Sequence, residues 1–143
     1  MTKIDDANNS ITYGKLYNWY AATDSRKLAP IGWHVPSDAE WETLRTYLGG
    51  QTVTGGKIKE AGNSHWKSPN TGATNETGFT ALPGGSRLIN GAFYLIYYDA
   101  YLWSTTENTS ANAWAQFLYY DGSNAYRNNP YKRAGFSVRC LMD

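Results

Sequence analysis

The chain carries few side chains of the kinds that do chemistry at neutral pH. His34 and His65 are its two histidines, and Cys140 is its one cysteine. Neither histidine has a Cys, Asp or His at zinc-ligand spacing, and one cysteine cannot form an internal disulfide framework. No nucleophile–histidine–acid arrangement is visible, and Gly55-Gly56 and Gly84-Gly85 lack the flanks of a phosphate loop. We therefore expect a non-enzyme without metal or cofactor, in which His34 has a structural role.

Calcium is the remaining metal to consider, because it binds through oxygen atoms. It takes about six to eight oxygen ligands, usually including several carboxylates. Asp99, Glu107 and Asp121 are the acids that could converge in space. No carboxylate pair accompanies them, so we expect no calcium site.

The composition points to contact with a partner rather than to catalysis. Aromatic residues make up 15% of the 143 residues, with 12 Tyr, and charged residues only 17%. Abundant Tyr, Asn, Ser and Gly with low charge is typical of binding surfaces such as antibody loops. The alternative is a small β-rich domain that uses Tyr for packing. The net charge of +1, without a basic stripe, argues against nucleic acid as a partner.

The candidate partner-binding residues gather near the C-terminus. Residues 113–120 alternate like a strand, and Asp121-Gly122 predicts a tight type I′ turn, because both of its central positions need positive φ. A return strand over residues 123–128 follows. We predict that ligand contacts come from this Tyr/Asn/Arg patch: Tyr119, Tyr120, Asp121, Ser123, Asn124, Tyr126, Arg127, Asn128, Asn129 and Tyr131.

Strand alternation limits how many of these side chains share one face. Tyr119 and Tyr120 cannot both point the same way. We expect the most exposed members to be Tyr126, Arg127, Asn128, Asn129 and Tyr131. Tyr97, Tyr98 and Tyr101 are expected to border the patch. The expected core residues are Trp41, Trp103, Trp114, Phe136 and Val138.

The elements that must position this patch follow from local signals. Residues 1–11 form a loose lead-in, and Thr12 caps a helix over residues 13–22. Ser37 and Glu40 form a capping box that starts a helix over residues 38–48. A shorter helix is expected at 54–61, followed by a loop pinned by Trp66.

Strands are expected later in the chain. They cover residues 79–82, 86–89, 92–98 and 135–141, with a hairpin turn at Asn90-Gly91. Helices before antiparallel strands indicate one α+β domain over residues 1–143. No apolar run is long enough to span a membrane, and the short polar start does not resemble a signal peptide.

Five ordered motifs carry a family resemblance. They are Tyr17-Asn18-Trp19, GWHVPSDAEW at 32–41, GFTALPGG at 78–85, WSTTE at 103–107 and GFSVRC at 135–140. From about Tyr13 to the C-terminus, the chain resembles the Fibrobacter succinogenes major paralogous domain family. The resemblance implies a C-type-lectin-like fold with two main helices, a small twisted antiparallel sheet and a long loop region that carries ligand contacts. It also favours an extracellular, cell-surface or virion-associated location.

The same resemblance leaves several functions open. We expect a non-catalytic ligand-binding or display domain that binds a protein or surface glycan through the Tyr/Asn/Arg patch. One alternative is a retroelement-diversified variable protein of a phage or bacterium, whose exposed positions near the C-terminus vary. A second is an enzyme of the formylglycine-generating type, which lone Cys140 argues against. A third is a purely structural part of a larger surface or virion protein, and the oligomeric state stays open.

Overall fold

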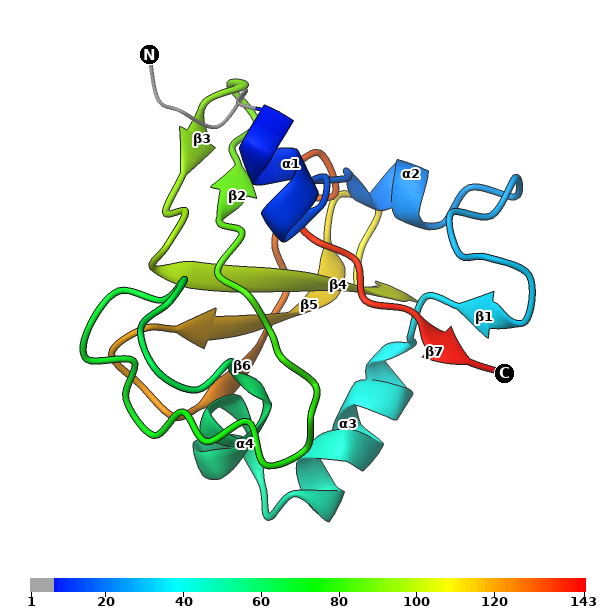
Figure 1. Ribbon diagram of the computed structural model, residues 1–143. Coiled ribbons are helices and arrows are strands. Elements are labelled where there is room, and N and C mark those ends of the chain that lie inside the picture. Colours follow the sequence, from blue (N-terminus) through cyan, green and yellow to red (C-terminus); the bar gives the residue numbers. More distant parts are fainter. Residues whose placement is uncertain (1–6) are drawn as a thin grey trace.

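The computed structural model describes residues 7–143 as an α+β domain (Figure 1). Its elements in chain order are α1 (Ala7–Tyr13), α2 (Trp19–Ala22), β1 (Trp33–His34), α3 (Asp38–Tyr47), α4 (Gln51–Ile58), β2 (Ser86–Arg87), β3 (Phe93–Tyr94), β4 (Asp99–Glu107), β5 (Ala113–Tyr119), β6 (Ala125–Asn128) and β7 (Leu141–Met142). The predicted α+β class is confirmed.

The antiparallel sheet β4-β5-β6 divides the domain into two layers of packing. In Figure 1, α3 and α4 lie on one side of this sheet, and α1, α2 and the β2–β3 hairpin lie on the other. Leu118 on β5 belongs to the core on the α3/α4 side, whereas Phe117 packs into the core on the hairpin side. The alternation predicted for residues 113–120 is therefore confirmed.

Helix α3 begins where its local sequence predicts. The Ser37 side chain accepts a hydrogen bond from the Glu40 backbone N–H, and Glu40 accepts one in return from the Ser37 backbone. Trp41 and Leu48 face the core as expected, and the helix side of the sheet also buries Arg45, which the sequence pattern did not predict. The Arg45 guanidinium donates to Gln116 on β5 and pairs with Glu42.

Helix α4 begins three residues earlier than predicted and contains two glycines that its packing requires. A Cβ atom at Gly55 would lie 2.1 Å from the carbonyl oxygen of Asn124, and one at Gly56 would lie 2.3 Å from that of Gly72. No real side chain tolerates such contacts with backbone atoms. These glycines weaken the helix intrinsically, but Gly55 lets it approach the β5–β6 loop and Gly56 lets it approach the loop that follows α4.

The predicted helix over residues 13–22 is wrong. Gly14 has φ +74°, which ends α1 at Tyr13, and Tyr17 forms an antiparallel bridge with Phe136. A new four-residue helix, α2, then begins at Trp19 with Asn18 as its N-cap. Helix α1 also contradicts the expected loose lead-in from residue 7 onward, while residues 1–6 lie outside the described part of the chain.

Several predicted strands are shorter than expected, because their backbones leave the extended region. The strand over 92–98 is limited to Phe93–Tyr94, since Leu95 and Tyr97 have positive φ. Within 79–82 only Ala81 pairs, through a bridge to Lys59, and the strand predicted over 86–89 is limited to Ser86–Arg87. The segment predicted as a last strand makes single bridges at residues 135–137, and β7 pairs with β1.

Candidate ligand-binding groove

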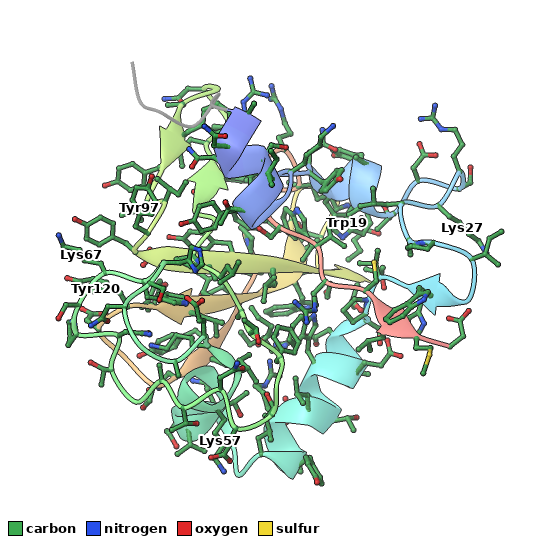
Figure 2. All side chains as sticks on the ribbon, viewed as in Figure 1. Trp19, Lys27, Lys57, Lys67, Tyr97 and Tyr120 are labelled. Carbon is green, nitrogen blue, oxygen red and sulfur yellow. The ribbon has the colours of Figure 1, made fainter. Side chains whose placement is uncertain are left out.

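The residues of the predicted Tyr/Asn/Arg patch divide between the two faces of the sheet. Tyr119 and Tyr126 lie on the hairpin side, with ring centroids 5.3 Å apart. Tyr120 packs on the α3/α4 side against the core there and against Tyr98, at 5.2 Å. In the view of Figure 2, Tyr120 lies at the end of the sheet near which Tyr97 and Lys67 also appear. Tyr98 thus borders the Tyr120 side of the sheet, whereas the Tyr97 ring packs edge-on against Tyr13 of α1, at 6.0 Å.

Arg127 is held on the α3/α4 side by contacts within the domain. Its Nη2 atom lies 2.8 Å from Oδ2 of Asp38, in the first turn of α3. Its guanidinium carbon lies 3.2 Å from the ring centroid of Trp114, a close cation–π contact. Trp114 is therefore covered by Arg127 rather than enclosed in the core, contrary to the prediction. Arg127 links the sheet to the start of α3.

The loop between β5 and β6 is not the type I′ turn that Asp121-Gly122 predicts. Strand β5 ends at Tyr119 and β6 begins at Ala125, so the connection covers residues 120–124, and neither Asp121 nor Gly122 has positive φ. The ammonium of Lys59 holds this loop, donating to the carbonyl oxygens of Tyr119 and Gly122. Asp121 remains exposed.

Helix α4 supports the same loop from the side. The Ser123 hydroxyl donates to the Thr52 carbonyl at 2.8 Å, and the Gly56 N–H donates to the Ser123 carbonyl at 2.9 Å. The Asn124 carbonyl packs against Gly55. Ser123 and Asn124 therefore have roles in fixing the loop that the sequence pattern did not reveal.

An open groove of about 610 Å³ lies on the hairpin side of the sheet. Tyr101 and Phe117 on β4 and β5 contribute to it, together with Phe136. Further lining residues come from the β2–β3 hairpin and from the segment after β6, namely Ser86, Leu88, Ile89, Asn90, Tyr94, Leu95, Pro130, Tyr131 and Ala134. Tyr131 is 59% exposed and Tyr94 is 54% exposed. Of the predicted patch, Tyr131 lines the groove, and Tyr126, which pairs with Phe117 across the strands, lies beside it.

The contribution of the hairpin was missed by the sequence analysis. Leu88 and Ile89 are apolar and exposed just before the predicted Asn90-Gly91 turn. These apolar residues next to a hairpin turn were the sequence signal that could have identified the side of the groove formed by the β2–β3 hairpin. Gly85, with φ +66°, fixes the hairpin, because a Cβ atom there would lie 2.4 Å from the Tyr94 carbonyl oxygen.

A buried carboxylate, Asp99, does not itself line the groove but contacts two residues that do, Leu95 and Tyr101. Asp99 is only 6% exposed, and its Oδ2 atom accepts a 2.5 Å hydrogen bond from the Tyr101 hydroxyl. Its backbone N–H donates to the Leu95 carbonyl. Burial raises the pKa of Asp99, and burial next to this carboxylate raises the pKa of Tyr101 and Tyr119.

The remaining candidate residues for chemistry do not converge. Asp99 interacts electrostatically with Asp121, whereas Glu107 lies at the other end of β4 and pairs with Lys132. Within residues 7–143, no cluster of three or more His, Cys, Asp or Glu side chains could hold a metal ion. Burial raises the pKa of the half-buried Cys140 thiol, which disfavours the nucleophilic thiolate.

His34 has the structural position that the sequence predicted. Its Nδ1 atom lies 2.7 Å from Oδ1 of Asp143, and its Nε2 atom lies 2.8 Å from Oε1 of Glu40. These hydrogen bonds to two carboxylates raise the pKa of His34. The imidazole therefore links the C-terminal end of the chain to the capping box of α3.

Comparison with known proteins identifies the family. The model of the Fibrobacter succinogenes major domain matches residues 1–142. The chain belongs to this family. The match extends further toward the N-terminus than the resemblance that begins near Tyr13. No curated protein and no solved structure gives a significant match to this Fibrobacter succinogenes major domain. None of its described helices is long and apolar enough to cross a membrane.

Proposed function

We propose that this Fibrobacter succinogenes major domain is a non-catalytic ligand-binding module, and that its ligand binds in the groove between the β2–β3 hairpin and the sheet. The observation that carries the proposal is the exposure of large apolar side chains on both walls. Leu88, Ile89 and Tyr94 stand on the hairpin, and Tyr131 stands opposite. Contiguous exposed apolar surface of this kind is typical of interaction sites.

The floor of the groove is rigid, which favours binding. Tyr101 and Phe136 are buried and stacked, with ring centroids 5.1 Å apart, and Phe117 packs edge-on against both. A ligand therefore meets a preformed surface and does not have to order it. Tyr94 and Tyr131 add amphipathic rings, which serve as anchors in protein interfaces and stack on sugar faces.

We propose no catalytic role, because the groove brings together aromatic and aliphatic side chains rather than a nucleophile and a base. Cys140 does not line it. The C-type-lectin-like architecture implied by the family resemblance remains part of this proposal, as does a location at a cell or virion surface.

A second proposal, a retroelement-diversified variable protein, is favoured by the way the β5–β6 loop is held. Lys59 contacts the carbonyl oxygens of Tyr119 and Gly122, and α4 contacts those of Ser123 and Asn124. Apart from the Ser123 hydroxyl, which donates to the Thr52 carbonyl, these contacts use the backbone of the loop and so allow most of its side chains to vary. A template repeat that differs at adenines and lies beside a reverse transcriptase gene would support this proposal. Its absence from the gene neighbourhood would contradict it.

The groove assignment is tested by binding of variants to an array of cell-surface proteins and glycans. We expect the double variant Tyr94→Ala/Tyr131→Ala to bind its partner about tenfold or more weakly, because it loses two aromatic anchors. Tyr20→Ala/Tyr47→Ala removes two exposed tyrosines outside the groove and should bind as the unmodified chain does. The assignment would be contradicted if both double variants lost affinity equally, or if neither lost affinity.

A further inference from the structure

We infer that the ligand is a protein segment that presents a lysine or arginine side chain next to apolar residues, with the cation bound beside Asp99. This inference rests on the proposed function, because it names the chemistry that the groove selects. The apolar walls contact the apolar residues of the segment. The Asp99 end of the groove contacts the cation.

Asp99 is a buried carboxylate that lacks a cationic partner. Buried charges in proteins are ordinarily paired, because an isolated charge loses its hydration. Among residues 7–143, no lysine, arginine or histidine forms an ion pair with Asp99. Its one side-chain partner is the neutral hydroxyl of Tyr101. The Asp99 carboxylate is thus a buried negative charge beside the groove that no cationic side chain of residues 7–143 neutralises.

The second oxygen of this carboxylate is available to a ligand. Oδ1 of Asp99 accepts no hydrogen bond from the described residues, yet it is not one of the fully buried side-chain atoms that lack a partner. Oδ1 therefore retains contact with solvent. An incoming ammonium or guanidinium group can donate to it without displacing the bond from Tyr101.

Aromatic rings surround the same carboxylate. Tyr119 is directly opposite Asp99 in the β4–β5 register, and Tyr126 packs against Tyr119. Tyr101 donates its hydroxyl to Asp99, and Tyr94 interacts electrostatically with Tyr101. Tyrosine faces attract cations, and they do so more strongly where water is excluded. Rings and a buried carboxylate together form a site for a cation.

Lys59, which bonds the carbonyl of the neighbouring Tyr119, does not occupy this site. The Lys59 ammonium donates to the carbonyls of Thr71, Tyr119 and Gly122 and lies over the Trp66 ring on the α3/α4 side. A protein segment is favoured over a glycan because the groove walls are Leu88, Ile89 and Leu95 beside aromatic rings. A sugar would leave many hydroxyl groups unpaired against such walls.

The test uses a phage-displayed library of random peptides selected on the full chain. We expect the selected peptides to share a lysine or arginine beside apolar residues. Replacing that cationic residue with norleucine should weaken binding to the unmodified chain about tenfold. On Asp99→Asn, which preserves the shape and the Tyr101 hydrogen bond, the same replacement should change affinity less than about twofold. Glu76→Gln removes one exposed negative charge elsewhere and should retain the full effect.

The outcomes separate this inference from the proposed function. Peptides that need Tyr94 and Tyr131 but carry no cation would overturn the inference and leave the groove as the binding site. The inference would also be overturned, with the groove retained, if replacing the peptide's cationic residue with norleucine weakened binding to Asp99→Asn as much as to the unmodified chain. If the folded chain selects no peptide and binds a glycan through the groove, the inference falls and the proposed function stands. If it binds neither kind of ligand, both fall.

Discussion

The ammonium nitrogen of Lys59 lies 2.9 Å from the carbonyl oxygen of Gly122, although the two residues are 63 positions apart in the chain. Lys59 is fully buried and makes two further bonds, to the carbonyls of Thr71 and Tyr119. One side chain thus joins the end of α4, the long loop after it and the β5–β6 loop. This contact explains why the loop beside the proposed site keeps one shape without a tight turn.

The first prediction concerns the pH dependence of stability at Lys59. Burial lowers the pKa of Lys59 from 10.5 to about 8 in the folded chain. Between these two values the unfolded chain binds more protons, so the free energy of unfolding should rise with pH. Urea unfolding at several pH values from 7.5 to 9.5 measures this slope.

Lys59→Met is the control for that prediction. It fills a similar volume, cannot titrate and should remove the upward slope over the same range. Subtracting its curve also removes the tyrosine contribution of opposite sign, because the raised pKa values of Tyr101 and Tyr119 make stability fall at high pH. An identical slope in both chains would contradict the assignment.

The second prediction concerns the packing of α4 on the β5–β6 loop. Gly55→Ala places a Cβ atom 2.1 Å from the Asn124 carbonyl oxygen. Although alanine favours a helix, we expect the overlap to lower the free energy of unfolding by about 1–3 kcal/mol. Gly122→Ala is the matched control, since nothing lies within 4 Å of its added Cβ. It should change stability by less than about 0.5 kcal/mol in thermal or urea unfolding.

The third prediction separates scaffold from binding surface at Arg127. Arg127→Ala removes the contacts with Asp38 and Trp114 and should lower stability by about 1 kcal/mol. Its affinity for the ligand should stay unchanged, because the guanidinium lies on the α3/α4 side of the sheet. Tyr131→Ala should show the reverse pattern, with weaker binding and unchanged stability. Unfolding curves and titrations on the same preparations decide between them.

The sequence predicted those features whose cause is local. Helix α3 is specified by the Ser37–Glu40 capping box, and β5 was predicted from the alternation of side chains between its two faces. The predicted helix over residues 13–22 failed because Gly14 adopts positive φ and Tyr17 pairs with Phe136, 119 positions away in the chain. No pattern within a short window encodes that pairing.

Only part of the candidate site was predictable from the sequence, because the rest depends on contacts between segments that are far apart in the chain. Tyr126 and Tyr131 were identified by residue type, and strand alternation anticipated that Tyr119 and Tyr120 would separate. The opposite wall of the groove comes from the β2–β3 hairpin, whose position depends on contacts such as that of Gly85 with Tyr94. The ion pair between Arg127 and Asp38 also depends on tertiary structure. Residue types alone therefore did not show that the patch divides between the two faces of the sheet.

The central claim is that ligand binds in the groove on the hairpin side of the sheet. Amide chemical-shift mapping of the isotope-labelled chain, titrated with a partner from the protein, glycan or peptide panels, tests it most directly. We expect the largest shifts to cluster at Leu88, Tyr94, Asp99, Phe117 and Tyr131. Shifts concentrated instead at Tyr98, Tyr120 and Arg127, on the α3/α4 side, would contradict it.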